Sequence, residues 1–169
     1  ENMKAEIICA DQGLLLGEKV NKAGAYIAGR CTALGHTLMG QSIPGEDRRR
    51  LGACLRQACR RSDALFILSG PGEAQRGLLR EAARKVLNKE IAPETEMLEE
   101  NGKLLFFLSG NEKKICRLFE AQAVPCLEKT RPGVLCTRIL KICGTQEGQA
   151  AKALGTLLKR KNPEILLSE

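Results

Sequence analysis

The sequence has almost no aromatic residues and very little histidine. Its 169 residues include no Trp, one Tyr, four Phe and one His. Proteins that bind single-stranded nucleic acid gain much of their binding energy by stacking bases on aromatic side chains, so this scarcity argues against such a partner. The core must be built from Leu, Ile, Val, Ala and Cys. A content of 43% hydrophobic and 28% charged residues is that of a globular domain.

Long apolar stretches and paired cysteines are also missing. There is no run of 18 apolar residues and no signal peptide, so we expect a cytoplasmic protein with no membrane partner. The eight cysteines include no Cys-x-x-Cys pair. They indicate small buried side chains in a reducing compartment rather than disulfides or a zinc site.

Positive charge is in excess, but it is not concentrated in a long run. The formal net charge is +7, which favours an anionic partner such as a phosphate-bearing small molecule. The longest basic clusters, Arg48-Arg49-Arg50 and Lys159-Arg160-Lys161, are short enough to be solvated helix faces. We therefore expect no nucleic-acid partner.

Apolar segments alternate with segments of helical periodicity along the chain. The pattern predicts strands over residues 5–9, 37–43, 64–68, 104–108 and 134–142, and helices over 20–34, 51–59, 78–87, 115–125 and 150–158. The polar stretch 93–102 is expected to be a connection with at most one helical turn. This alternation predicts an α/β fold with a mostly parallel sheet and helices on both faces. We expect one domain over residues 1–160 and a C-terminal tail or linker end over 161–169.

Four loops follow the carboxyl ends of the expected strands, where open α/β sheets bind their ligands. They are residues 10–17, 44–47, 69–77 and 109–113. The loop from Ser69 to Gly77 is neither a Walker A motif nor a dinucleotide-binding fingerprint, and a Gly-Pro-Gly turn is also common in a plain tight connection. Taken together, the four loops predict a site for a small anion near helix N-termini.

The loops and their spacing resemble those of one known family. The segment Asn101-Gly-Lys-Leu-Leu-Phe-Phe-Leu-Ser-Gly110, with Leu14-Leu15-Leu16-Gly17, Gly45-Glu46-Asp47 and Arg80-Glu81-Ala82, is similar to the MoaB/Mog-like molybdopterin-binding domain, and most closely to the N-terminal domain of competence/damage-inducible protein A (CinA). The resemblance implies a three-layer α/β/α domain that binds a phosphorylated pterin or a nucleotide. For the CinA branch it also implies magnesium-dependent hydrolysis of a pyrophosphate such as ADP-ribose, and relatives that assemble as homo-oligomers.

The chain departs from the family pattern in the ligand loops. Where the family has GGLGPTxDD-L-T, this chain has Ser69 to Leu79 with both acidic positions replaced. The resemblance therefore implies a degenerate phosphate- or nucleotide-binding module with weak or absent catalysis and no metal ligands, and whether the chain is an enzyme stays open. One alternative is an active Mg²⁺-dependent pyrophosphatase whose metal site is rebuilt from Asp11, Glu46, Asp47 and Glu73. Another is an oligomerisation scaffold.

Each candidate site residue has a structural alternative. The expected ligand-binding residues are Asp11, Gly45, Ser69, Gly70, Gly72, Arg76, Ser109 and Gly110, and the candidate catalytic residues are Glu46 and Asp47. Asp11 can instead cap a turn, and Glu46 and Asp47 can stabilise the first turn of a helix. Arg76, Arg80 and Arg84 can form one solvated stripe at helical spacing. His36 follows a helix-to-strand turn, away from the strand ends.

Overall fold

Two compact units make up the chain, residues 1–135 and residues 136–169. The computed structural model describes residues 2–130, 143–144 and 146–159. The strand expected over 134–142 lies outside the described residues, and the single domain expected over 1–160 stays a prediction. None of the described helices is long and apolar enough to cross a membrane.

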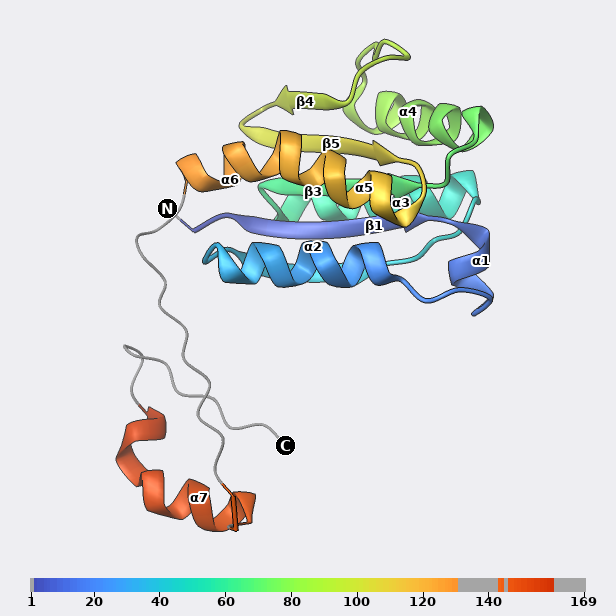
Figure 1. The fold of residues 1–169 in the computed structure, drawn as a ribbon. Coiled ribbons are helices and arrows are strands. Elements are labelled where there is room, and N and C mark those ends of the chain that lie inside the picture. Colours follow the sequence, from blue (N-terminus) through green and yellow to red (C-terminus); the bar gives the residue numbers. More distant parts are fainter. Residues whose placement is uncertain (1, 131–142, 145, 160–169) are drawn as a thin grey trace. The chain divides into compact units, whose positions relative to one another are not determined.

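The first unit is built on a five-stranded sheet (Figure 1). Its strands are β1 (Lys4–Ala10), β2 (Thr37–Ser42), β3 (Ala64–Ser69), β4 (Met97–Glu100) and β5 (Lys103–Ser109), in the order β2-β1-β3-β5-β4. β1 pairs in parallel with β2 and β3, β3 pairs in parallel with β5, and β4 is antiparallel to β5. The mostly parallel sheet expected from the sequence is confirmed.

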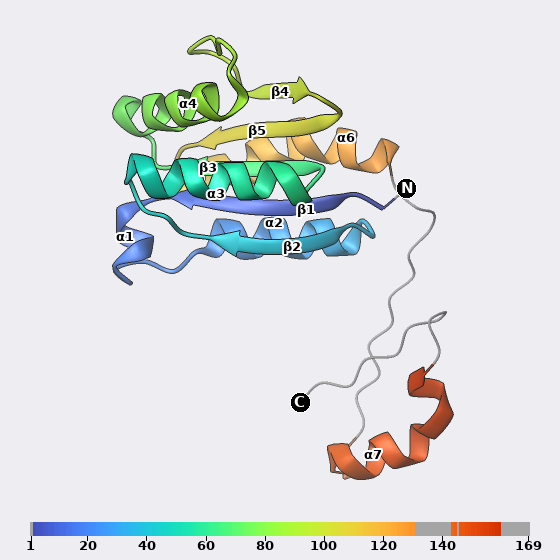
Figure 2. The same cartoon turned by 180° about the vertical axis from the view of Figure 1, so that it is seen from behind.

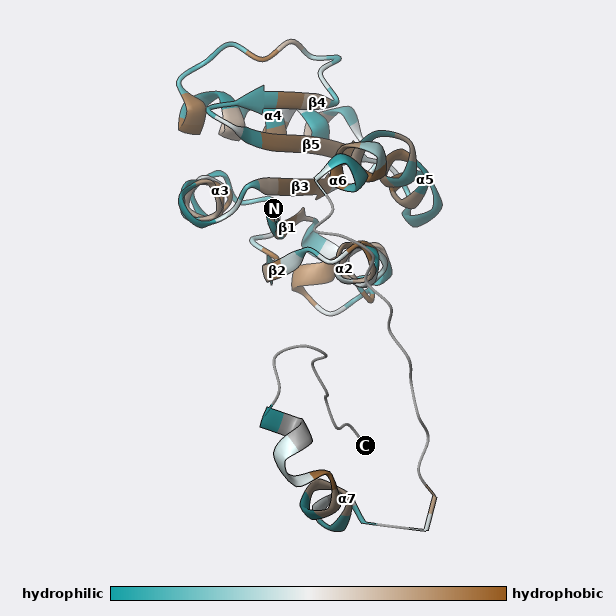
Figure 3. Cartoon of the chain, turned by 90° about the vertical axis from the view of Figure 1, so that its left-hand side faces the viewer, coloured by the Kyte–Doolittle hydropathy of each residue, from teal (hydrophilic) through white to brown (hydrophobic). Residues whose placement is uncertain are grey.

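Helices cover both faces of this sheet, which gives the expected three layers. On one face lie α2 (Lys22–Ala33), α5 (Glu112–Leu118) and α6 (Val124–Lys129), and on the other lie α3 (Arg48–Arg61) and α4 (Glu73–Leu87) (Figures 1 and 2). The short helix α1 (Gln12–Leu15) follows the end of β1. Figure 3 shows the apolar strands enclosed between helices whose outward faces are hydrophilic.

The core is divided by the sheet because successive strand residues point to opposite faces. Ile7 of β1 belongs to the cluster that includes Ile27 of α2, whereas Ile8 belongs to the cluster with Leu51 and Leu55 of α3. All six residues of β3 are buried, as expected of a central strand covered on both sides.

Two expectations about the middle of the chain were wrong. α4 begins at Glu73 rather than Leu78, with Gly72 as its N-cap. Its first turns are polar and carry no apolar period, so the sequence pattern concealed them. The stretch expected to be a connection contains β4, an edge strand in which Leu98 pairs with Leu105. Four residues that end in two glutamates are too few to show the alternation of a half-buried strand.

The helix expected to end near Pro125 continues past it. A π-helical segment (Phe119–Ala123) joins α5 to α6, and the proline lies in the first turn of α6. The amide of Val124 reaches back to the carbonyl of Phe119, which is the wider spacing of a π-turn. Proline is tolerated there because the π-turn already interrupts the α-helical hydrogen-bond pattern just before it, at the first turn of α6.

In the second unit the described elements are α7 (Glu147–Leu154) and a 3₁₀ turn (Gly155–Lys159). The helix expected over 150–158 is thus confirmed in its first part. It changes to the tighter form at Gly155, whose φ of 45° is accessible to glycine.

Candidate functional site

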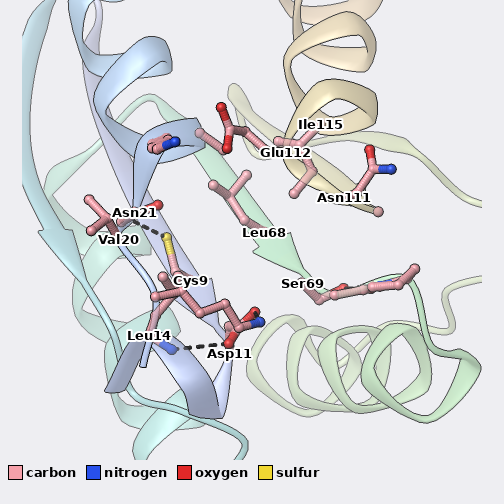
Figure 4. Close-up of a pocket in the computed structure, with 16 residues that line it drawn as sticks. Cys9, Asp11, Leu14, Val20, Asn21, Leu68, Ser69, Asn111, Glu112 and Ile115 are labelled. Atoms are coloured by element: carbon pink, nitrogen blue, oxygen red, sulfur yellow. Dashed lines mark hydrogen bonds and ion pairs between the residues drawn. The ribbon is translucent and has the colours of Figure 1, made fainter. Parts of the chain in front are cut away.

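A pocket of about 480 Å³ opens at the carboxyl ends of β1, β3 and β5, where the sequence places the loops (Figure 4). Apolar side chains supply part of its wall: Leu14, Val20, Ala23, Leu68 and Ile115. Polar groups supply the rest: Cys9, Asp11, Lys19, Asn21, Lys22, Asn111 and Glu112, with Ser69, Gly70, Pro71 and Gly110 from the loops after β3 and β5. An apolar wall with a few convergent polar groups is the usual composition of a small-molecule site.

The loops after β3 and β5 lie side by side, as the sequence predicted. Ser69 and Ser109 are register partners, and their hydroxyl oxygens are 2.8 Å apart. The amide of Gly110 donates to the carbonyl of Ser69 at 3.1 Å. Gly110 is buried with φ of 152°, and a Cβ there would come within 2.7 Å of the Lys114 side chain, so this turn requires glycine. Of the predicted residues, Ser69, Gly70 and Gly110 line the pocket, and Ser109 supports it through Ser69.

Asp11 also lines the pocket, but both of its oxygens have partners. Oδ1 accepts from the amide of Leu14 at 3.1 Å, which makes Asp11 the N-cap of α1, and Oδ2 accepts from Lys19 Nζ at 2.7 Å. Burial alone would raise the pKa of this carboxyl, but the bonds from Lys19 and Leu14 outweigh burial and lower it. The capping alternative for Asp11 is confirmed.

Asn21 and Cys9 form a second polar contact in the pocket that was absent from the predicted site. Asn21 caps α2 by accepting from the amide of Gly24 at 2.9 Å, and its side-chain amide donates to Cys9 Sγ at 3.3 Å. Burial raises the pKa of the Cys9 thiol to about 11, so the thiol stays protonated at neutral pH. Asn21 and Asn111 could have been found from the sequence, because asparagine is a favoured N-cap residue and each lies at or just before the start of an expected helix.

The candidate catalytic acids lie at the same edge of the sheet but do not line the pocket. Asp47 is the N-cap of α3 and accepts from the amide of Arg50 at 2.8 Å, a bond that lowers the pKa of its carboxyl. Glu46 is exposed and accepts a long 3.4 Å bond from Gln75. Gly45 is buried with φ of 68°, and a Cβ there would come within 2.7 Å of Gln12 and Leu15. The helix-start alternative is confirmed for Asp47.

Gly72 and Arg76 also lie outside the pocket lining. Gly72 caps α4, and Arg76 pairs with Glu73 of the same helix. Arg80 and Arg84, which follow Arg76 at helical spacing on α4, also bond to nearby groups. Arg80 donates to the carbonyl of Thr95 at 3.1 Å, and Arg84 pairs with Glu90 at 3.0 Å. These contacts make the stripe part of the α4 surface.

The acids of the proposed rebuilt magnesium site do not converge. Asp11 bonds to Lys19, Asp47 caps α3, and Glu73 pairs with Arg76. Across residues 2–130, 143–144 and 146–159, no group of three or more His, Cys, Asp or Glu side chains could hold a metal ion. Magnesium in proteins is held mainly through carboxylates, and three of the four proposed acids are caps or ion-pair partners, while Glu46 is exposed and accepts a long bond from Gln75. This donor set does not fit the ion.

His36 has a structural role at the opposite end of the sheet. Its Nδ1 accepts from the amide of Met3 at 3.2 Å, and its Nε2 lies 2.9 Å from the carbonyl of Leu127. The ring is buried and joins the start of β2 to α6. This placement agrees with the expectation that His36 lies away from the strand-end site.

Solved structures with the same fold include proteins of molybdenum-cofactor biosynthesis. The protein CinA from Thermoplasma acidophilum is similar with a TM-score of 0.64 at 18% identity, over 72% of this chain and 96% of that one. The molybdopterin biosynthesis enzyme MoaB from Thermus thermophilus is similar with a TM-score of 0.59 at 16% identity, over 75% and 97%. At these identities the likeness establishes the fold.

Curated relatives match nearly the whole chain. A putative competence-damage inducible protein from Alkaliphilus oremlandii is 27% identical over 207 aligned positions, which cover 96% of this chain and 50% of the relative. A similar protein from Clostridium novyi is 28% identical with the same coverage. The chain thus spans about half the length of these relatives, and the alignment is longer than the chain itself. Residues 6–129 match the family model described as "Probable molybdopterin binding domain", and the chain belongs to this family.

Proposed function

We propose that the strand-end pocket binds a small phosphate-bearing ligand, a pterin or a nucleotide, without a divalent cation and with weak or absent catalysis. One observation carries the proposal: the pocket unites the ends of three parallel strands with the turns at Gly70 and Gly110. The family description, which names a molybdopterin-binding domain, supports a pterin-like ligand. Ligands of α/β sheets bind at this edge because loops and helix N-termini present free amides there.

The lining divides the pocket into two kinds of surface. Leu68 and Ile115 offer an apolar wall against which a flat heterocycle can pack. Lys22 supplies positive charge at the start of α2, whereas Lys19 is paired with Asp11. Gly70 leaves its backbone open because a Cβ there would meet nothing within 4 Å. In this arrangement the ring binds against the apolar wall and a phosphate binds the ammonium group of Lys22.

Among the residues that the structure describes, the carboxylates do not converge, and this favours binding over hydrolysis. A magnesium-dependent pyrophosphatase needs acids that hold the ion between phosphate oxygens. The pocket contains Asp11 and Glu112, and Asp11 is already bonded to Lys19. A cation-independent ligand fits these side chains better than a metal-bound one.

A thermal-shift screen tests the proposal. ADP-ribose, AMP, NAD and a pterin are each added with and without Mg²⁺, and a ligand at 100 times its Kd should stabilise the protein by about 2.7 kcal/mol. We expect stabilisation by at least one ligand, equal in both conditions. Lys22→Gln should weaken it, and Lys113→Gln, an exposed lysine beyond the lining, is the matched control.

Two results would contradict the proposal. Failure of every ligand to stabilise the protein would remove the binding role. Magnesium-dependent conversion of ADP-ribose to AMP and ribose 5-phosphate, abolished in Glu46→Ala with Asp47→Ala, would favour the active pyrophosphatase.

The homo-oligomer expected from the resemblance also stays a proposal, and light scattering tests it.

A further inference from the structure

A second hollow of about 470 Å³ is lined by residues of α3 and α4. These two helices lie on the face of the sheet opposite α2 and α5 (Figure 2). We call this hollow the α3/α4 groove and define it by its charged lining residues Arg48, Arg49, Arg56, Glu81 and Lys85. It shares no lining residue with the strand-end pocket. Four cations and one anion line it, so its side chains carry a net charge of +3.

The single carboxylate of the groove is shared by two of the cations. Glu81 pairs with Arg48 at 2.9 Å and with Lys85 at 3.0 Å. Arg49 and Arg56 have no carboxylate partner within 4.0 Å among the residues that the structure describes. Two guanidinium groups are therefore available to an anion that enters the groove.

The position of these arginines on α3 opposes the electrostatics of the helix. The N-terminus of a helix carries partial positive charge and disfavours cations. The first turn of α3 nevertheless contains Arg48, Arg49 and Arg50, and the adjacent acid, the N-cap Asp47, pairs with Arg50 at 3.8 Å. Asp47 therefore offsets part of the positive charge, and an anion bound beside Arg48 and Arg49 would offset more of it.

Small residues share the lining of the groove with the cations, so no large side chain at these positions fills it. Gly52, Ala53 and Ala82 line the groove between the charged side chains. A Cβ at Gly52 would come within 3.6 Å of Arg56 Nη1, so this guanidinium lies beside the bare backbone of Gly52.

We propose that the α3/α4 groove binds a small anion with a chain of two or more phosphates, either inorganic or the polyphosphate of a nucleotide. Guanidinium groups bind phosphate oxygens in bidentate fashion, and two unpaired arginines beside two further cations suit more than one phosphate. A hollow of about 470 Å³ is within the usual range for small-molecule sites and suits a compact ligand. This site is independent of the function proposed for the strand-end pocket.

Titration of the full 169-residue chain with inorganic triphosphate, followed by calorimetry and by amide NMR at 150 mM salt, tests the groove. We expect the Gly52 amide to shift while those of Gly70 and Gly110 in the strand-end pocket do not. Arg49→Gln with Arg56→Gln should weaken binding about tenfold or more, since charge-assisted bidentate bonds are the strong ones. Arg60→Gln with Arg117→Gln removes the same charge from exposed positions outside the groove and should change affinity less than about twofold.

A comparison of ATP with inorganic triphosphate distinguishes the two possible ligands, the polyphosphate of a nucleotide and an inorganic phosphate chain. Tighter binding of ATP than of inorganic triphosphate, followed at the Gly52 amide and not at those of Gly70 and Gly110, would assign the groove to nucleotides, and equal binding at Gly52 would assign it to the phosphate chain alone. The proposal is overturned if triphosphate at 1 mM leaves Gly52 unshifted, or if the control variant loses as much affinity as the groove variant. It is also overturned if sulfate at matched ionic strength shifts Gly52 equally, or if an RNA oligonucleotide binds the groove more tightly than any small anion.

Discussion

The two ends of the sheet use polar side chains in opposite ways. Near the strand starts, Glu6, His36 and Ser62 are buried and each has a hydrogen-bond partner inside the protein. At the strand ends, Lys22 and Glu112 are exposed around an open pocket, and neither forms an ion pair among the residues that the structure describes. Polar groups that are buried and satisfied hold elements together, whereas polar groups around a hollow are available to a ligand. Changes at the first end should therefore affect stability, and changes at the second end should affect binding.

The largest effect is expected from removing the buried carboxylate at the strand starts. Glu6 accepts two bonds from Arg61, at 2.9 and 2.6 Å, and one from Ser62 Oγ at 2.9 Å. Glu6→Ala leaves the buried Ser62 hydroxyl without its acceptor and should lower the free energy of unfolding by roughly 3 kcal/mol. Urea unfolding measures this loss, and ligand binding by the folded fraction should be retained.

Glu112→Ala is the matched change at the strand ends. Glu112 is exposed and lies in the first turn of α5, so its loss should cost about 0.5 kcal/mol or less. Equal losses of unfolding free energy in Glu6→Ala and Glu112→Ala would contradict the proposed difference between the two ends of the sheet.

A smaller effect is expected from the glycine that shapes the turn after β2. Gly45→Ala places a Cβ 2.7 Å from Gln12 Oε1 and Leu15 Cδ2 at a φ of 68°, and it should cost about 1–2 kcal/mol. Gly77→Ala, in the middle of α4 with open space around it, should instead raise stability by about 0.5–1 kcal/mol. Thermal unfolding of both variants checks the difference in sign, and a gain from Gly45→Ala would show that this turn tolerates a side chain.

The hydroxyl pair below the pocket should give an effect of about the size of one hydrogen bond. Ser69→Ala leaves the buried Ser109 hydroxyl without its 2.8 Å partner and should cost about 1 kcal/mol. In the double variant with Ser109→Ala no hydroxyl is left unpaired, so its cost should be less than the sum of the two single variants. A double-mutant cycle by urea unfolding measures this coupling, and additive costs would show that the two hydroxyls act separately.

The scaffold was predictable because its signals are local and periodic. The continuous apolar run of β3 and the stripe of Leu51 and Leu55 on α3 each follow from one repeating spacing. β4 and the first turns of α4 were missed because short or polar segments carry no such period. The passage through Pro125 depends on a π-turn, which no spacing in the sequence announces.

The site was predictable in position but not in composition. Strand order places the loops at one edge, which brought Ser69, Gly70 and Gly110 into the pocket. Sequence alone could not show that Lys19 reaches back to Asp11, or that Asn21 bonds to Cys9, because both contacts depend on how the loop after β1 folds. It also placed Glu46 and Asp47 near the right edge without showing that they lie outside the lining.

The smallest effect is expected at Asp11, where a pocket residue has a structural partner. Because the folded-state pKa of Asp11 is lowered, its carboxylate stabilises the fold above the ordinary value of 3.8 and loses this contribution as the pH falls through the lowered value. Asparagine is about as good an N-cap residue as aspartate. Asp11→Asn therefore removes the charge and the bond from Lys19 while keeping the cap of α1. The variant should be slightly less stable than the parent at pH 6 and equal to it at strongly acid pH, as measured by thermal unfolding across this range. Glu94→Gln changes an exposed acid outside the pocket and should show no such trend. If Asp11→Asn stays less stable than the parent in strong acid, the cap and not the charge stabilises this end of the sheet.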